Sequence, residues 1–391
     1  MSDERQLEPK LRFPEFDGEW EKTSLKNISK NISYGMNASA KKFDGKNKYL
    51  RITDIDEESR EFKPNPLTSP SGKIDEKFVL KEGDILFTRT GASVGKSYLY
   101  NKDDGRLLFA GFLIRFNILK ANPKFIFLQT LRRKYNQWVY VYSIRSGQPG
   151  LNAEEYKSFE VYSTAIQEQQ KIADFLSSID THIQTLEKKK EALELYKKGV
   201  TQKIFKQEIR FKNDDDNGFP KWKKKKLGKV CSINKGEQLN KIELFESGKY
   251  PSISGGINPS GYTDKWNQDK NTIIISEGGN SCGYVNFITQ KFWCGGHCYS
   301  LIINDNSIEK IFLYHLLKFY EPNIMRLRVG SGLPNIQKKD LSKFKLIIPS
   351  LAEQTKIADF LSAIDQQIQG INQQIEYTKT YKKGLLQLMF V

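Results

Sequence analysis

The strongest pattern of hydrophobic and polar positions occurs twice in the chain, in residues 165–205 and 350–390. Apolar residues recur there at alternating intervals of four and three, which is typical of an apolar seam along one side of a helix. The seam consists of Ile172, Leu176, Ile179, Ile183 and Leu186 in the first stretch, and of Ile357, Leu361, Ile364, Ile368 and Ile371 in the second. Both stretches are predicted to form helices about 60 Å long.

The two stretches are copies of one sequence. At a constant offset of 185 positions, 20 of the 41 residue pairs are identical, and both copies contain E-Q-x-K-I-A-D-F-L-S and then Y-K-K-G. A helix with one apolar seam needs a cover, and two copies in one chain can cover each other. We therefore expect the helices to pair, and to run antiparallel because a folded domain lies between them. The alternative, an ordinary helical hairpin within a core, is less favoured because neither flank continues a helical pattern.

The start of each helix has the spacing of a capping box. Thr164 stands three residues before Gln167, and Ser350 three residues before Glu353. In a capping box these side chains satisfy amide groups that the first turn leaves unpaired. We expect both helices to begin at these residues.

A second repeat marks the beginnings of the globular domains. Trp20 and Trp222 each open a W-x-x-x-x-L segment, and each follows a Phe-Pro pair. The polar run 212–218 has the character of an exposed linker. We divide the chain into a first domain (1–164), a first helix (165–205), a linker (206–218), a second domain (219–349) and a second helix (350–391).

Each domain contains short β-type runs bounded by Gly, Asn and Pro, followed by a helical stretch. The expected strands are 84–88, 97–100 and 113–117 in the first domain and 272–276 and 300–303 in the second, and the helical stretches are 123–135 and 307–319. An S-G-x-P loop follows at 146–149 and 331–334. The predicted fold class is α+β, with two globular domains, each followed by a long helix, and the two helices packed as an antiparallel coiled coil.

The composition indicates a folded and strongly basic protein. With 391 residues and 38% hydrophobic residues, the chain can form two or three cores. The net charge of +16 favours a polyanionic partner, of which nucleic acid is the leading candidate and a merely solvated basic surface the alternative. Apolar runs are far too short to span a membrane, and four cysteines confined to the second half do not resemble a disulfide framework. A cytoplasmic location with reduced thiols is expected.

The motifs favour a chain without catalytic residues. Residues 84–97 resemble a phosphate loop, but Gly91 and Gly95 enclose three residues where a Walker A loop has four. Cys294, His297 and Cys298 lie close together, but no second cluster completes a zinc site. An amino-methyltransferase motif is missing, since residues 258–261 lack its second proline and aromatic residue, and no nuclease signature is found. We expect no catalytic residue, metal or cofactor in this chain.

The candidate DNA contacts lie on glycine loops and in basic clusters. The loop at 88–97 keeps its glycines but loses Lys96 in the second copy, at 276–283, as expected for loops that read different partners. A pair of plain β-turns is the alternative. Lysines would fix the position on phosphates while loop side chains select bases. The predicted DNA-binding residues are Arg89, Thr90, Ser93, Lys96, Arg145, Lys223, Lys224, Lys225 and Asn280.

In these features the chain resembles the specificity subunit of type I restriction-modification systems. The resemblance rests on the doubled helix motif and on two diverged domains that open and close alike, and it covers nearly the whole chain. It implies a non-catalytic DNA-binding subunit with two target recognition domains. Each domain would read one half of a bipartite, asymmetric site, and the helices would set the gap.

The resemblance also implies partners. Two methylation subunits that bind S-adenosylmethionine would make an adenine-specific DNA methyltransferase, and two restriction subunits that use ATP and Mg would add endonuclease activity. Polar identity between the helix copies is not required by seam packing and suggests docking surfaces for methylation subunits. The predicted docking residues are Gln169, Lys171, Asp174, Gln354, Lys356 and Asp359.

Three other functions remain open at this stage. The chain could be a coiled-coil structural adaptor with incidental charge, which would show no salt-sensitive DNA affinity. It could be a fused restriction-modification enzyme, which the missing motifs argue against. An RNA reader is compatible with the charge, although no aromatic-rich RNA-binding signature occurs.

Overall fold

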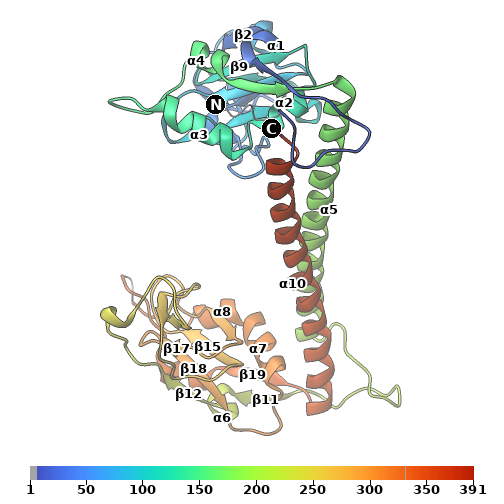
Figure 1. Ribbon diagram of the computed structural model, residues 1–391. Helices are drawn as coiled ribbons and strands as arrows, with labels where there is room; N and C mark the ends of the chain where they lie inside the picture. The colour runs from blue at the N-terminus through green and yellow to red at the C-terminus, as the bar shows by residue number, and fades with distance from the viewer. Residues whose placement is uncertain (1–6, 331) are drawn as a thin grey trace. The chain divides into compact units, whose positions relative to one another are not determined.

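The computed structural model describes residues 7–330 and 332–391, so Ser331 of the second S-G-x-P motif lies outside the described residues. The chain divides into two compact units, residues 1–186 with 374–391 and residues 187–373. Each unit contains one globular domain and parts of both long helices, α5 (Ile166–Phe205) and α10 (Leu351–Leu388) (Figure 1).

The first unit is built on a four-stranded antiparallel sheet in the order β2-β9-β6-β7. Two-stranded sheets β1-β10, β3-β5 and β4-β8 surround it, the last of them parallel. Its elements are β1 (Glu21–Ser24), α1 (Leu25–Ile28), β2 (Ser29–Tyr34), β3 (Ala40–Lys42), β4 (Lys48–Leu50), β5 (Thr68–Pro70), β6 (Asp84–Thr88), β7 (Ser97–Leu99), β8 (Leu107–Phe109), β9 (Leu113–Ile118), α2 (Pro123–Gln129), α3 (Arg133–Ser143), α4 (Ala153–Ser158) and β10 (Glu160–Ser163).

The second unit repeats this plan, with a four-stranded antiparallel sheet in the order β12-β18-β15-β16. A two-stranded sheet β11-β19 and a three-stranded sheet β14-β13-β17 accompany it. Its elements are β11 (Lys223–Lys226), α6 (Leu227–Val230), β12 (Cys231–Lys235), β13 (Tyr250–Ile253), β14 (Gly261–Thr263), β15 (Thr272–Ser276), β16 (Val285–Ile288), β17 (Trp293–Cys294), β18 (Cys298–Ile303), α7 (Lys310–Phe319), α8 (Glu321–Met325), α9 (Lys338–Lys343) and β19 (Lys345–Ile348). The predicted α+β class and the expected strand runs are confirmed.

The long helices contribute directly to the cores of the domains. In the first unit, the ring centroid of Trp20 lies 5.4 Å from that of Phe125 in α2 and 5.9 Å from that of Phe390, which follows α10. In the second unit, Phe205 at the end of α5 packs 5.9 Å from Phe312 of α7. The seam residues are buried except Ile368, which is half-buried. The seam is therefore covered partly by the domains and not only by the other helix.

Within each unit α5 and α10 run antiparallel beside each other. Asp180 of α5 forms an ion pair with Lys382 of α10 in the first unit, and Lys197 of α5 pairs with Asp365 of α10 in the second. The two aspartates are equivalent by the 185-residue offset, and so are the two lysines. Each ion pair is thus the other with the helices exchanged.

The predicted capping box at Ser350 does not form. The carboxylate of Glu353 is occupied by Arg210, whose Nη2 lies 2.7 Å from it, and Ser350 Oγ has no hydrogen-bond partner among the described residues. At the other helix, Thr164 Oγ1 donates to Glu168 and not to Gln167. In both copies the glutamate of the first helical turn accepts hydrogen bonds from an arginine that lies before the domain, Arg12 for Glu168 and Arg210 for Glu353.

None of the helices in the described part of the chain combines the length and apolarity that a membrane-spanning segment needs. Within residues 7–330 and 332–391, no three His, Cys, Asp or Glu side chains gather as metal ligands. All four cysteines are buried and free.

Candidate nucleic-acid interface

The glycine loop and the S-G-x-P loop of the first domain lie side by side. Thr90 forms an isolated β-bridge with Gly150, the amide of Gly91 donates to the carbonyl of Pro149 at 3.0 Å, and the amide of Leu151 donates to the carbonyl of Arg89 at 2.9 Å. Gly91 has φ +75°, a backbone conformation that favours glycine. The chain therefore joins two motifs that are more than fifty residues apart in sequence into one loop pair.

The second domain has the same loop pair. Gly278 bridges to Asn335, the amide of Gly279 donates to the carbonyl of Pro334 at 3.0 Å, and the amide of Ile336 donates to the carbonyl of Glu277 at 2.8 Å. The backbone pairing is thus retained while most side chains differ. Such a pair can present different functional groups from one fixed scaffold.

The predicted residues of the first loop pair differ in exposure. Arg89 lies with its guanidinium 4.8 Å from the centre of the Tyr34 ring, which holds it in place by a cation–π contact. Thr90 and Ser93 are half-buried at the tip of the glycine loop. Arg145 is exposed and forms an ion pair with Glu155. In the second pair Asn280 is exposed.

Lys96 does not have the exposed side chain that was predicted. Only 8% of it is exposed, and its Nζ donates to the carbonyl of Ile55 at 3.2 Å and pairs with Glu57 at 2.5 Å. Lys96 directly precedes β7, and both partners of its ammonium group belong to a segment that is distant in sequence. Lys96 therefore has an anchoring role within the domain.

Lys223, Lys224 and Lys225 lie on β11, away from the glycine loop in sequence, and pair with β19. Lys223 and Lys224 are exposed, while Lys225 forms an ion pair with Asp305 at 2.6 Å. The ammonium of Lys225, with Ser307, lowers the pKa of Asp305 to about 2.

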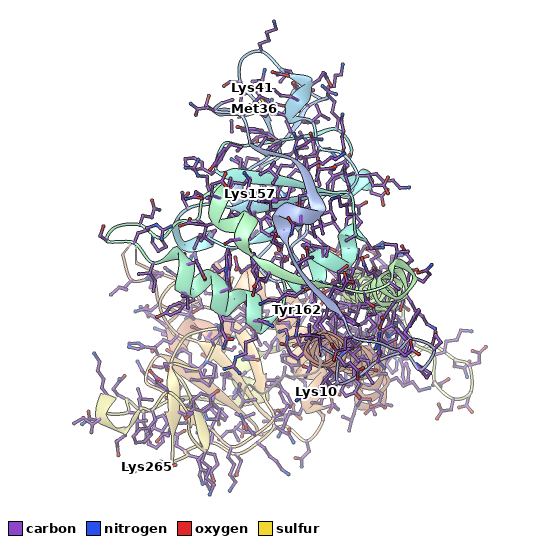
Figure 2. All side chains as sticks on the ribbon, turned by 45° about the horizontal axis from the view of Figure 1, so that its top comes forward. Lys10, Met36, Lys41, Lys157, Tyr162 and Lys265 are labelled. Atoms are coloured by element: carbon purple, nitrogen blue, oxygen red, sulfur yellow. The ribbon has the colours of Figure 1, made fainter. Side chains whose placement is uncertain are left out.

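The corresponding region of the first domain is less basic. There β1 carries Glu21 and Lys22, and Lys157 of α4 (Figure 2) pairs with Glu154 at 2.6 Å.

Two of the predicted docking residues, Gln169 and Gln354, do not face outward. They are 2% and 1% exposed. Gln169 accepts from the amide of Asn122 at 2.8 Å and donates to the carbonyl of Thr164, and Gln354 accepts from the amide of Glu309 at 2.9 Å and donates to the carbonyl of Pro349. Each glutamine ties its long helix to the start of the helix α2 or α7. Their identity between copies therefore has a structural reason.

The other four predicted docking residues lie on outward faces. Asp174 and Asp359 are exposed, Lys171 pairs with Glu15, and Lys356 pairs with Asp214 at 2.7 Å. A hollow of about 520 Å³ on the first helix is lined by Ile166, Gln167, Gln170, Lys171 and Asp174. Ile166 and its counterpart Leu351 are 52% and 44% exposed.

Sequence reasoning missed the residues that attach each domain to its helix. Glu168 and Glu353 are almost completely buried, and each receives two hydrogen bonds from an arginine, Arg12 or Arg210. The residue after each arginine is a phenylalanine that packs edge-on against a helix phenylalanine. The repeated Arg-Phe pair was the signal available in the sequence. Arg210 lies inside the predicted linker, residues 206–218.

Comparison with known proteins gives this architecture a class. The family model described as the type I restriction modification DNA specificity domain matches twice, over residues 17–195 and 220–377. The chain therefore contains two DNA specificity domains. It belongs to the family of type I restriction-modification specificity subunits.

Individual relatives agree with this assignment. A putative type I specificity subunit of Mycoplasma pneumoniae is 36% identical over 171 residues, which span 43% of this chain and 45% of that protein. A putative type I restriction enzyme specificity subunit of Methanocaldococcus jannaschii is 28% identical over 97% of this chain and 95% of its own length. The crystal structure of the type I S subunit from M. genitalium has the same fold, with a TM-score of 0.65, 19% identity and coverage of 98% of this chain and 99% of that one.

Proposed function

We propose that this chain is a non-catalytic subunit that directs an adenine methyltransferase and endonuclease complex to a bipartite, asymmetric DNA site, with each domain reading one half. The observation that carries the proposal is the loop pair that both domains build with the same backbone hydrogen bonds and with different side chains. A constant scaffold with variable side chains is what two readers of different half-sites require. Membership of the specificity-subunit family supports the same function.

Base contacts in the first half-site are assigned to the loop that carries Arg89, Thr90 and Ser93. An arginine held over an aromatic ring is preorganised for two hydrogen bonds to guanine in the major groove. Asn280 follows Gly279 on the glycine loop of the second domain, and an asparagine can form two hydrogen bonds to adenine. Arg145, Lys223 and Lys224 would contact phosphates and contribute affinity without sequence preference.

Mapping of methylated adenines tests this proposal. The chain is co-expressed with a candidate methylation subunit, and the sites modified in a random DNA pool are sequenced. The expected result is a split motif with a fixed gap, which disappears when the chain is omitted. Methylation of the same sites without the chain would contradict the proposal.

Two single substitutions separate the two readers. Arg89→Ala should relax or change the first half-site only, and Asn280→Ala the second only, because each loop pair belongs to one domain. Lys120→Ala, an exposed residue outside both loop pairs, is the matched control and should leave both halves unchanged. A change in both half-sites from either loop variant would refute independent reading.

The helices would set the gap between the half-sites. Four residues inserted after Leu186 in α5, with four after Gln373 in α10, lengthen both antiparallel helices at the junction between the units. The added length is about 6 Å, which corresponds to one or two base pairs, that is, roughly 3.4 Å each. The gap should widen while both half-sites stay the same. An unchanged gap in an active complex would remove this role from the helices.

Docking of two methylation subunits is assigned to the outward faces of the helix copies. The exposed apolar residue, Ile166 or Leu351, lies one or two turns before a lysine and an aspartate at the same positions in both copies. One surface present twice fits two copies of one partner. Those subunits would supply S-adenosylmethionine, and two restriction subunits would bring ATP and Mg.

A further inference from the structure

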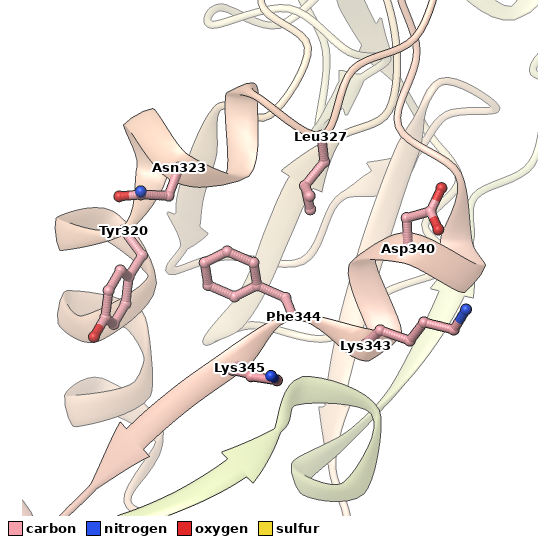
Figure 3. Close-up of a pocket in the computed structure, with 7 residues that line it drawn as sticks. All are labelled: Tyr320, Asn323, Leu327, Asp340, Lys343, Phe344 and Lys345. Atoms are coloured by element: carbon pink, nitrogen blue, oxygen red, sulfur yellow. The ribbon is translucent and has the colours of Figure 1, made fainter.

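The second domain has an aromatic pocket between α8 and α9, formed by the rings of Tyr320 and Phe344 (Figure 3). Their centroids are 5.7 Å apart in an edge-to-face arrangement, and both side chains are partly exposed. The pocket has a volume of about 590 Å³, and its remaining lining residues are Asn323, Leu327, Asp340, Lys343 and Lys345. Apolar ring surface left in contact with water costs hydrophobic free energy, so a ligand that covers it would be stabilised.

The first domain contains the same ring pair with a cover. At the 185-residue offset, Tyr135 and Phe159 replace Tyr320 and Phe344 and again pack edge-to-face, with centroids 5.0 Å apart. Here both rings are buried, with 1% and 5% exposed. The indole ring of Trp138 packs against them, 6.1 Å from Tyr135 in a stacked arrangement and 4.9 Å from Phe159.

The second domain lacks this cover because Asn323 stands at the position of Trp138. The neighbouring residues keep their roles, since Val139 and Ile324 are both buried in the cores of their domains. In the first domain the ring pair thus packs against a large aromatic side chain. The residue at the same position in the second domain supplies no such ring.

The surface around the pocket is basic, which favours a ligand with negative charge. The elements β11, α9 and β19 carry eight lysines and one aspartate, whereas the corresponding β1, α4 and β10 of the first domain carry two lysines and four glutamates. Lys345 at the pocket is the cross-strand neighbour of Lys226, so the basic surface is continuous from the pocket onto β11. Lys343 and Lys345 border the pocket itself, whereas Lys223 and Lys224, to which phosphate contacts are assigned, lie on β11 outside the pocket lining. This basic surface belongs to the second domain alone.

We propose that the pocket of the second domain binds an acidic segment of a partner protein, with an aromatic side chain of that segment inserted against Tyr320 and Phe344. Carboxylates on either side of the inserted ring face Lys343 and Lys345. Because the first domain closes its equivalent pocket with Trp138, each chain binds one such segment. This interaction is independent of the docking surfaces that occur twice on the helices, and it does not rest on the proposed half-site reading.

A peptide titration of the full-length chain tests the proposal. The probe is a fluorescently labelled peptide, Asp-Glu-Asp-Trp-Glu-Asp-Glu, and its anisotropy is followed at low salt. Saturable binding is expected, with at least a tenfold loss when alanine replaces the tryptophan of the peptide and a further loss at high salt. Equal binding of the alanine peptide, or no saturation, overturns the proposal.

Two protein variants locate the site. Asn323→Trp installs the cover that the first domain carries and should weaken peptide binding at least tenfold, while the methylation motif and melting temperature stay unchanged. Ile242→Trp, at a position that is 82% exposed elsewhere in the same unit, is the matched control and should bind normally. If Asn323→Trp does not fold, Lys343→Glu with Lys345→Glu gives the same test through charge. Normal peptide binding by these variants, or loss of DNA binding in place of peptide binding, refutes the site.

Discussion

The carboxylate of Glu353 accepts two hydrogen bonds from the guanidinium of Arg210, at 3.0 and 2.7 Å, and lies completely buried at the start of α10. Trp222 Nε1 donates to the same carboxylate at 3.1 Å. The pair Arg12 and Glu168 repeats this geometry at the start of α5 in the first unit, with distances of 2.8 Å. These contacts fix the segment that precedes each domain on the helix that follows it.

Removal of this carboxylate should destabilise the second unit. Glu353→Ala leaves the guanidinium of Arg210 and the indole N–H of Trp222 without their acceptor, and a partly buried charge without its partner costs about 2–4 kcal/mol in the free energy of unfolding. Urea unfolding measures the loss. Glu194→Ala removes an exposed glutamate beside Lys190 of α5 and should cost no more than about 0.5 kcal/mol. Equal effects of the two substitutions would contradict an anchoring role for Glu353.

Docking and anchoring on α10 can be separated by two substitutions. Gln354→Ala should lower stability by about 1–2 kcal/mol because the amide of Glu309 loses its buried acceptor, and it should leave the affinity for methylation subunits intact once folded. Asp359→Lys, on the exposed face, should weaken association with a methylation subunit without changing the melting temperature. Analytical ultracentrifugation with thermal unfolding measures both. Intact association of the Asp359→Lys variant would show that this face does not bind the methylation subunit.

The second unit should lose stability in mild acid through His315. Burial, with Lys197 nearby, lowers the pKa of His315 to about 4, although Asp365 lies 3.9 Å from its Nε2. The folded state then binds fewer protons than the unfolded state, in which the pKa is about 6.5. The resulting loss in the free energy of unfolding is absent above pH 7, grows as the pH falls through 6.5, and reaches about 2 kcal/mol at pH 5.

Urea unfolding at pH 7.5 and pH 5 checks this sign. His315→Leu should lose less stability than the wild-type chain over this interval. His182→Leu, an exposed histidine on α5, should behave like the wild type. The same pH dependence in all three chains would show that other groups cause it.

The first unit should depend on the side chain of Phe390. This ring is 3% exposed and lies 5.1 Å from Phe125, so Phe390→Ala removes about 3–5 kcal/mol of core packing. Hydrogen exchange should show weakened protection in residues 7–186 and unchanged protection in the second unit. Leu388→Ala, at a position that is 41% exposed, is the control. Loss of protection confined to residues 187–373 would contradict the assignment of Phe390 to the first core.

The long helices could be predicted from the sequence because their periodicity is local and their copies align without a gap. The central strands were predictable for a related reason, since three consecutive apolar residues lie at the centre of β6 and of β15. What escaped prediction depended on the loops between motifs. Arg12 precedes Trp20 by eight positions and Arg210 precedes Trp222 by twelve, so alignment of the Phe-Pro pairs concealed the equivalence of the two arginines.

The predicted site was harder to assign because a polar residue in a sequence does not reveal which side of it will be covered. The sequence predicts surface positions for both Lys96 and Gln354. In the fold Lys96 donates to the carbonyl of Ile55, which is distant in sequence, and Gln354 accepts from the amide of Glu309 before α7. The pairing of the glycine loop with the S-G-x-P loop also comes from the tertiary fold. Sequence identified both motifs without placing them together.

Phe390 packs in the core of the first unit, and Arg132, the residue before α3, donates to its carbonyl and to that of Val391. During synthesis on the ribosome, the first domain emerges well before these residues, with the whole of the second domain translated in between. The core around Trp20 therefore stays incomplete until residues 385–390 leave the exit tunnel. Synthesis of the second domain and of α10, and not completion of the first domain, is what lets this core close.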